Sequence, residues 1–163
     1  MGKEKSFTID NMRKEDVDQV LAIEQASFTS PWSRNLFLSE FRSPGVSSLL
    51  VALHDAPVRT VTGFIVYWVV QDEMHILNLA VMPAFRRNGL ARMLVADAIR
   101  RAQRKGARRA FLEVRISNTN AQKLYSHLGF TGVSVRREYY DAPVEDAVVM
   151  MLDQGALQSL AGS

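Results

Sequence analysis

The stretch from Leu77 to Arg92, LNLAVMPAFRRNGLAR, constrains the fold more than any other part of this chain. Its first half, Leu77 to Val81, is apolar and is closed by Pro83, which predicts a buried strand. Its second half opens an amphipathic helix after a short basic turn that contains Gly89. The free N–H groups of a helix's first turn and the positive end of its dipole point to one spot, which suits a phosphate group. The sequence therefore predicts a strand, a phosphate-binding turn and a helix in direct succession.

The turn matches neither of two common phosphate loops. The pattern G-x-x-x-x-G-K-[ST] would indicate a nucleoside triphosphate and G-x-G-x-x-G a dinucleotide, whereas the turn RRNGLA has a single glycine. A basic turn before a helix is often only a solvated turn. Taken alone, the motif leaves a solvated turn and a phosphate site both open.

The segments after this stretch predict a crossover between two parallel strands. Apolar residues recur at helical spacing from Gly89 to Lys105, and Gly106 stands where a glycine commonly ends a helix. Ala107 to Arg115 then has the pattern of a strand. Because a strand, helix, strand order in one sheet forms a crossover, this strand is expected to run parallel to Leu77–Val81.

The remaining segments predict an α+β fold. Further strands are expected over Phe7–Asn11, Ser47–His54, Val61–Val70, Val133–Tyr139 and Asp146–Leu152. Further helices are expected over Glu15–Phe28, Arg34–Phe41 and Asn118–Leu128. The result is a mixed, twisted sheet of about seven strands with about four helices. We expect one domain over residues 1–152 and a flexible tail over residues 153–163.

Composition limits the class of protein. Apolar residues make up 47% of the 163 residues and charged residues 23%, as in ordinary globular domains. The longest strongly apolar run, Phe64–Val70, is too short to span a membrane, and the absence of cysteine excludes disulfides and thiolate metal sites. We expect a cytoplasmic protein. Met1 to Ser6 fits the myristoylation pattern M-G-x-x-x-[ST], but this pattern is loose and we expect no lipid anchor.

Positive charge is concentrated in one part of the chain. The net charge is only +3, yet nine Arg or Lys residues and a single acid, Asp97, lie between Arg86 and Arg109. This block favours an anionic partner. A solvated helix face explains most of it. Since no aromatic stacking motif or zinc-finger spacing accompanies the block, we expect no stable binding of nucleic acid.

Five sequence strings resemble a known family. The pattern [QR]-x-x-G-x-[GA] is filled by Arg86, Gly89 and Ala91, and N-x-x-A-x-x-L-Y-x-x-L-G-F is filled between Asn118 and Phe130. Both are similar to the GCN5-related N-acetyltransferase (GNAT) superfamily. The strings LEVR, PWS and RREYY resemble its RimI-like branch, the bacterial ribosomal-protein-alanine N-acetyltransferases. The resemblance implies a GNAT fold whose parallel central strands splay apart.

The resemblance also implies acetyl-CoA as the cofactor. An extended pantetheine arm could pair like an inserted strand with main-chain groups between the splayed strands, and our candidates are Leu79, Ala80 and Val81. The pyrophosphate would be held by the basic turn, whose candidate residues are Arg86, Arg87, Asn88, Gly89, Leu90, Ala91 and Arg92. Ala91 stands where many relatives have a second glycine. Asn118 would contact coenzyme A, and it could also cap its own helix.

Two residues are candidates for catalysis. Glu113 lies in an otherwise apolar strand, where a carboxylate needs a partner. It could form an ion pair with Arg115 or Arg136, or act as general base on an α-amine, especially if burial raised its pKa. The resemblance assigns it the base role. Tyr125 shares a helix face with Asn118, and its phenol, with an ordinary pKa of about 10, could protonate a leaving thiolate. An ordinary core tyrosine is the alternative.

The acceptor is the least determined part of the prediction. The resemblance places Trp32, Tyr139 and Tyr140 beside an acceptor peptide, although each could be a structural aromatic residue. It implies that the chain acetylates the N-terminal α-amine of a protein, plausibly an N-terminal alanine of a ribosomal protein. Alternatives are a lysine side chain or a small-molecule amine, or a non-catalytic module that binds acyl-CoA or docks on RNA or the ribosome. The three histidines lack metal-ligand spacing, so we expect no metal.

Overall fold

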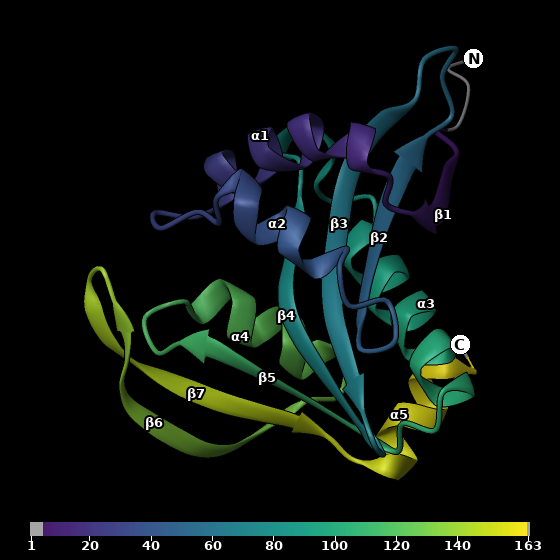
Figure 1. The fold of residues 1–163 in the computed structure, drawn as a ribbon. Coiled ribbons are helices and arrows are strands. Elements are labelled where there is room, and N and C mark those ends of the chain that lie inside the picture. The colour runs from purple at the N-terminus through teal and green to yellow at the C-terminus, as the bar shows by residue number, and fades with distance from the viewer. Residues whose placement is uncertain (1–4, 163) are drawn as a thin grey trace. The chain divides into compact units, whose positions relative to one another are not determined.

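The structure, a computed structural model, describes residues 5–162. The first residues of the myristoylation pattern therefore lie outside the described part. Seven strands are present among these residues: β1 (Phe7–Asn11), β2 (Ser47–His54), β3 (Thr60–Val70), β4 (Glu73–Val81), β5 (Arg109–Arg115), β6 (Thr131–Asp141) and β7 (Val144–Leu152). The helices are α1 (Val17–Ser27), α2 (Arg34–Glu40), α3 (Leu90–Arg104), α4 (Thr119–His127) and α5 (Gln154–Ala161), with short 3-10 turns η1 (Lys14–Asp16) and η2 (Pro83–Phe85). Figure 1 labels these elements along the chain.

The strands form one mixed sheet in the order β1-β2-β3-β4-β5-β7-β6. The β4–β5 pair is parallel, whereas β1–β2, β5–β7 and β6–β7 are antiparallel. The expected α+β architecture, the number of strands and the crossover through α3 are confirmed. Residues 5–162 contain five α-helices where about four were expected, and the extra helix is α5.

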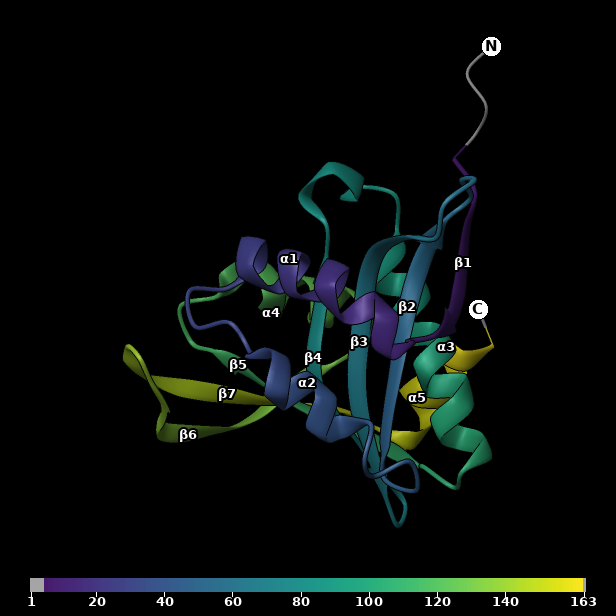
Figure 2. The same ribbon diagram turned by 45° about the horizontal axis from the view of Figure 1, so that its top comes forward.

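The described residues divide into two compact units. The first contains the chain up to Tyr67 together with Asn78–Ala98. In it α1 and α2 lie on one face of β2 and β3 and the first half of α3 lies on the other, as Figures 1 and 2 show. The core between these layers is completely buried, and its aromatic centre is Phe37 against Phe64, with ring centroids 5.5 Å apart. Burial of these faces explains why the amphipathic segments become helices here.

The helix ends follow the local sequence. Ser33 caps α2 by accepting a hydrogen bond from the Leu36 N–H at 3.2 Å. Gly106, with φ +98°, ends α3, because a residue with a Cβ is strained in that conformation. The expected start of the first long helix was less accurate, because residues 14–16 form a 3-10 turn before α1.

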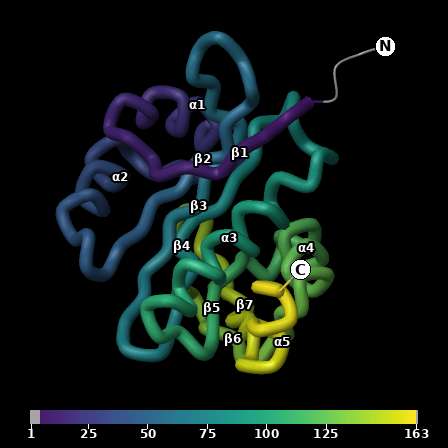
Figure 3. Tube along the Cα trace, turned by 90° about the vertical axis from the view of Figure 1, so that its right-hand side faces the viewer, coloured from purple at the N-terminus to yellow at the C-terminus, as the bar shows by residue number. Residues whose placement is uncertain are grey.

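The second unit contains Trp68–Leu77 and the chain from Ile99 onward. Residues alternate along β5, so that Ala110, Leu112 and Val114 are buried and Glu113 is on the opposite face. In the views of Figures 1 and 3, α4 and α5 both lie on one face of β5 and β7. The β6–β7 hairpin is longer than expected, since pairing continues through a bulge to Asp141 and Val144.

The C-terminal segment is a helix and not the flexible tail that the sequence suggested. Asp153 caps α5 by accepting a hydrogen bond from the Ala156 N–H at 2.9 Å. Leu157 and Leu160, one helical turn apart, are 1% and 5% exposed. This buried apolar pair orders a segment that is short, contains Gly155 and is followed by Gly162, features that weakened the helical signal in the sequence.

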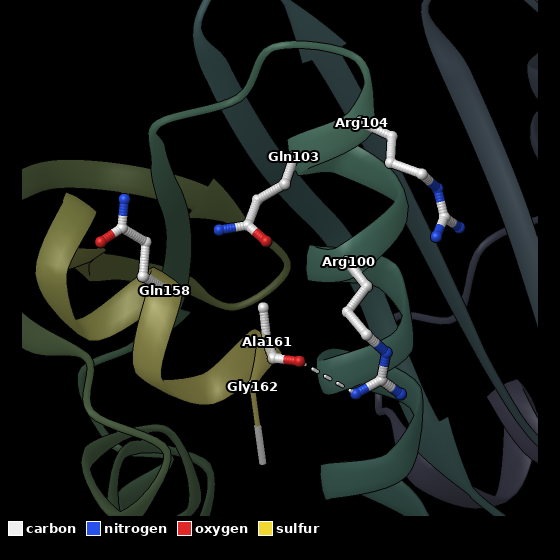
Figure 4. Close-up of a pocket in the computed structure, with 6 residues that line it drawn as sticks. All are labelled: Arg100, Gln103, Arg104, Gln158, Ala161 and Gly162. Carbon is white, nitrogen blue, oxygen red and sulfur yellow. Dashed lines mark hydrogen bonds between the residues drawn. The ribbon is translucent and has the colours of Figure 1, made fainter.

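A surface pocket lies beside α5. It has a volume of about 530 Å³ and is lined by Arg100, Gln103, Arg104, Gln158, Ala161 and Gly162. Figure 4 shows Arg100 of α3 donating to the Ala161 carbonyl at 3.4 Å, which ties the end of α5 to α3. None of the lining residues is a predicted site residue. Within residues 5–162, we find no helix with the length and apolarity needed to cross a membrane.

Candidate active site

The basic turn lies between η2 and α3 and leads into a helix, as its sequence predicts. Arg87 and Gly89 both have positive φ, at 67° and 71°. The helix begins at Leu90, and its first hydrogen bond runs from the Met93 N–H to the Gly89 carbonyl at 3.0 Å. The N–H groups of the helix's first turn precede this bond, so they remain available to an anion.

The space beside Gly89 is open. A Cβ at Gly89 would meet no atom within 4 Å beyond its chain neighbours. An alanine side chain at this position would therefore cause no steric clash within the protein. The glycine allows the positive φ, and it leaves an open cradle that a side chain would fill. Asn88 closes the turn, because its Nδ2 donates to the carbonyls of Phe85 and Arg86 at 2.8 and 3.2 Å.

Three arginines give the turn a positive charge. Arg86, Arg87 and Arg92 are all exposed. The Nε of Arg86 donates to the Val81 carbonyl at 3.3 Å, which ties the turn back to the end of β4. The arrangement therefore combines exposed guanidinium groups with helix N–H groups, a combination that attracts a diphosphate.

The pairing between the two parallel strands is short. The β4–β5 ladder covers three residue pairs, from Glu73–Arg109 to His75–Phe111, although β4 continues to Val81 and β5 to Arg115. Among the described residues, the later part of β4, which includes the candidates Leu79, Ala80 and Val81, takes no part in this ladder. Its main-chain groups on that edge can pair with an extended ligand as a strand would.

The other edge of β4 is supported closely by β3. A Cβ at Gly63 of β3 would stand 3.1 Å from the Ala80 carbonyl oxygen and 3.2 Å from a Leu94 side-chain carbon. The Met82 N–H also donates to the Thr62 carbonyl at 2.8 Å. A glycine in β3 thus lets β4 approach at the level of the candidate residues.

Glu113 is the centre of a polar cluster in the second unit. Its side chain is only 7% exposed. Oε2 lies 2.6 Å from Nε2 of His75, and Oε1 lies 3.9 Å from a guanidinium nitrogen of Arg136. Burial raises the pKa of Glu113, but the hydrogen bond and charge of His75, with the charge of Arg136, bring it below its ordinary value. Glu113 is therefore ionised at neutral pH.

Two tyrosines of β6 lie beside this carboxylate. The rings of Tyr139 and Tyr140 are perpendicular, with centroids 5.0 Å apart. The Arg136 guanidinium lies 5.7 Å from the Tyr139 ring centroid. Burial, and then the charges of Tyr139 and Glu113, raise the pKa of Tyr140 to about 12. Both tyrosines are neutral hydrogen-bonding groups at physiological pH.

Arg115 fixes the tip of the β6–β7 hairpin. It donates to the carbonyls of Pro143 and Ala142 at 3.0 and 3.4 Å, and to Glu145 at 3.3 Å. Its guanidinium also lies 4.2 Å from the Tyr140 ring centroid, a cation–π contact. Of the two arginines suggested as ion-pair partners of Glu113, only Arg136 lies near it, because Arg115 is engaged here.

Tyr125 lies within electrostatic range of Tyr140. Its side chain is buried on α4, with its ring 5.7 Å from that of Phe130. Burial raises its pKa well above the ordinary value, and the charge of Tyr140 adds to the rise. Its phenol therefore stays protonated. On the same helix, Asn118 is the N-cap and accepts a hydrogen bond from the Ala121 N–H at 3.1 Å.

Trp32 belongs to the first unit, where a buried carboxylate holds it. The backbone N–H of Trp32 donates a hydrogen bond to Oε1 of Glu24 at 3.0 Å. The Trp32 ring packs on Phe37, with ring centroids 5.1 Å apart. Burial raises the pKa of Glu24, and the hydrogen bonds from Trp32 and Asn78, which lower it, offset only part of that rise. Sequence reasoning missed both Glu24 and His75. A glutamate at an apolar helical position was a signal for the first, but nothing in the sequence pointed to the second.

The comparisons with known proteins agree with this architecture. Residues 17–130 match the model of the Acetyltransferase (GNAT) family. The chain therefore belongs to the GNAT family of acetyltransferases, and the family expected from the sequence strings is confirmed.

Three relatives that are more than 30% identical to the chain carry the same kind of name. The chain is 37% identical over 147 residues to the [ribosomal protein bS18]-alanine N-acetyltransferase of Salmonella typhimurium, covering 89% of this chain and 96% of that one. It is 35% identical to the enzyme of the same name from Haemophilus ducreyi, covering 88% and 98%. The crystal structure of the ribosomal-protein-S18-alanine N-acetyltransferase from Escherichia coli matches with a TM-score of 0.80 at 32% identity, covering 91% and 94%. These likenesses confirm the expected RimI-like branch and the enzyme class, an N-acetyltransferase.

Proposed function

We propose that this chain transfers the acetyl group of acetyl-CoA to the N-terminal alanine of a ribosomal protein of the bS18 kind, in the cytoplasm. The observation that carries the proposal is the likeness to bS18-alanine N-acetyltransferases, which extends over more than nine-tenths of their length. A lysine or small-molecule acceptor would leave that likeness unexplained. The acid–base cluster around Glu113 supplies the groups that such a transfer needs.

The residues present fit acetyl-CoA. The first turn of α3, with Arg86, Arg87 and Arg92, would hold the pyrophosphate over the open space at Gly89. The free edge of β4 at Leu79–Val81 would pair with the extended arm. When bound, the cofactor supplies an activated acetyl group as a thioester.

Glu113 would act on the acceptor amine. An α-amine has an ordinary pKa of about 7.7 to 8.0, so part of it is already neutral at physiological pH. The ionised carboxylate can orient the amine and accept its proton directly or through one water. Because the pKa of Glu113 is lowered, its contribution comes more from orientation and charge than from basicity.

Tyr125 would act on the leaving group. As the nitrogen–carbon bond forms and the carbon–sulfur bond breaks, its phenol can give a proton to the sulfur of coenzyme A. The ordinary pKa of a phenol, about 10, lies above that of a thiol, about 8.5, so this proton transfer is uphill, and the phenol contributes chiefly through its hydrogen bond to the departing sulfur. The chain has no cysteine, so we propose direct attack by the amine without a thioester on the protein.

Mass spectrometry of acetylated peptides tests the proposal. A peptide that begins with alanine, in the sequence of the bS18 N-terminus, should gain one acetyl group from acetyl-CoA. A second peptide, with a blocked N-terminus and an internal lysine, should remain unmodified, and so should a polyamine. Acetylation of the lysine or the polyamine alone would contradict the proposed acceptor.

A substitution then tests the proposed base. Glu113→Gln should lower kcat for the alanine peptide by about 10²-fold or more, since the amide carries no charge and cannot accept a proton. Glu15→Gln, at an exposed position on η1, is the matched control and should have parental activity. Equal turnover by Glu113→Gln and the parent would remove the role that we assign to this carboxylate.

A further inference from the structure

His75 is the closest side chain to the carboxylate of Glu113. It occupies the last residue pair of the β4–β5 ladder, opposite Phe111, and its ring reaches the neighbouring Glu113 on the same face of β5. The separation of 2.6 Å between Nε2 and Oε2 is that of a short charge-assisted hydrogen bond. The His75 side chain is 35% exposed whereas that of Glu113 is 7% exposed.

The two carboxylate oxygens have different surroundings. Oε2 faces His75 of β4, and Oε1 faces Arg136 of β6 at 3.9 Å, too far for a hydrogen bond. Tyr139 and Tyr140, also of β6, lie within electrostatic reach of the carboxylate. An ionised carboxylate only accepts hydrogen bonds, so the contact requires a proton on Nε2 of His75.

We propose that His75 is a positioning residue for Glu113, whose Nε2–H holds Oε2 and leaves Oε1 turned toward β6 to receive the acceptor amine. This inference rests on the proposed function, because it assigns Oε1 to the amine of that reaction. His75 touches neither substrate nor cofactor in this role, and it acts only through Glu113.

Electrostatics supports the geometry. Burial by itself would raise the pKa of Glu113, and His75 contributes the largest opposing interactions, through both its hydrogen bond and its charge. Without His75, the positive group beside Glu113 would be Arg136, whose guanidinium lies 3.9 Å from Oε1. The Arg136 side chain is 58% exposed, so solvent weakens its effect on the carboxylate. The pKa of Glu113 should therefore rise when the imidazole is removed.

Three variants test this role. His75→Phe removes the donor and keeps a planar ring, and His75→Gln keeps an N–H donor at a similar reach. His127→Gln, at an exposed position of α4, is the control for loss of a histidine. We expect His75→Phe to lower kcat for the alanine peptide on the order of tenfold, with unchanged KM for acetyl-CoA, and to move the acid limb of the pH profile upward. We expect His75→Gln to restore most of kcat and His127→Gln to match the parent.

A titration that needs no substrate separates this inference from the proposed function. NMR of the side-chain carboxyl carbon of Glu113 should give a higher pKa in His75→Phe than in the parent and His127→Gln. An unchanged pKa, or equal loss of kcat in His75→Phe and His75→Gln, would overturn the positioning role even if the alanine peptide is acetylated. If the parent acetylates no N-terminal peptide, the proposed function fails while the titration still decides the role of His75. Should His75→Phe fail to fold, His75→Gln and His75→Ala carry the same comparison.

Discussion

Oε2 of Glu24 on α1 accepts a hydrogen bond of 2.8 Å from Nδ2 of Asn78 on β4, and both side chains are buried. The other oxygen of Glu24 accepts the Trp32 N–H at 3.0 Å. The Glu24 carboxylate thus connects α1, the segment before α2 and the strand β4 through hydrogen bonds. Because both oxygens are occupied, the carboxylate is tolerated at 1% exposure.

The stability of the protein should depend on pH through Glu24. Its pKa is higher in the folded chain than the ordinary value of 4.5 that applies to the unfolded chain, so the folded chain keeps this proton longer. The free energy of unfolding therefore falls as pH rises from about 4.5 through the folded pKa. Glu24→Gln should remove this slope and, by leaving one donor without an acceptor, lower stability at all pH values by about 1–3 kcal/mol. Urea unfolding at a series of pH values measures both effects.

Asp10 provides a control of opposite sign. The hydrogen bond from Arg59, at 3.0 Å from Asp10, lowers the pKa of this carboxyl below its ordinary value of 3.8. Its contribution to stability is present above pH 3.8 and is lost as pH falls through the lower folded value. Asp10→Asn should therefore differ from the parent above that range and converge with it in acid. A slope near pH 5 that is the same in Glu24→Gln and the parent would contradict the assignment to Glu24.

Gly89→Ala should weaken acetyl-CoA binding more than it weakens the fold. A Cβ at φ +71° is strained and should lower the free energy of unfolding by about 1–2 kcal/mol. The methyl group would also fill the cradle, so Kd for acetyl-CoA should rise on the order of tenfold or more. Gly106→Ala is matched for strain, with φ +98° and similar open space, and it should leave Kd unchanged. Calorimetric titration of both variants measures the difference, and an equal rise of Kd in the two would exclude the cradle.

Tyr125→Phe should lower kcat while binding of acetyl-CoA changes little. The phenol is buried and its pKa is raised, so it serves as a proton donor across the whole physiological range. Loss of a positioned acid typically costs about 10²-fold. Tyr67→Phe removes a hydroxyl from another buried tyrosine, on β3, and should keep parental kcat. Steady-state kinetics with the alanine peptide decides between a catalytic phenol and an ordinary core tyrosine, for which both variants would behave alike.

Arg115→Lys should affect the acceptor and not the cofactor. Lysine keeps the charge but cannot bond to Ala142, Pro143 and Glu145 together. The hairpin tip and the Tyr140 ring should become less fixed, and KM for the peptide should rise on the order of tenfold. KM for acetyl-CoA should stay unchanged. Arg137→Lys, at an exposed position on β6, is the control, and equal effects of the two variants would refute a specific role of Arg115.

Much of the fold follows from local patterns that the sequence displays. The bounds of β1 and β2 are those expected, and Gly106 and Gly129 end their helices with positive φ. These features depend on near neighbours in the chain, for which periodicity and turn chemistry are sufficient guides. The segment after Leu152 was misjudged because its order comes from burial of two leucines, which is a tertiary effect.

The site was predictable in its residue types but not in its pairings. Glu113 stood out as a carboxylate in an apolar strand, yet its partner His75 lies 38 residues earlier. No spacing rule connects two residues that meet only because their strands pair in parallel. The direction of the pKa shift of Glu113 depends on that partner, so the composition of the strand alone could not give it.

The three-pair ladder between β4 and β5 has a consequence for sequence variation. After His75, the edge of β4 that faces away from β3 presents backbone N–H and C=O groups to a ligand. Every non-proline residue supplies these groups equally. Substitutions among β-formers there would preserve this capacity for recognition. Cofactor binding can therefore be retained while the side chains that determine acceptor specificity diverge.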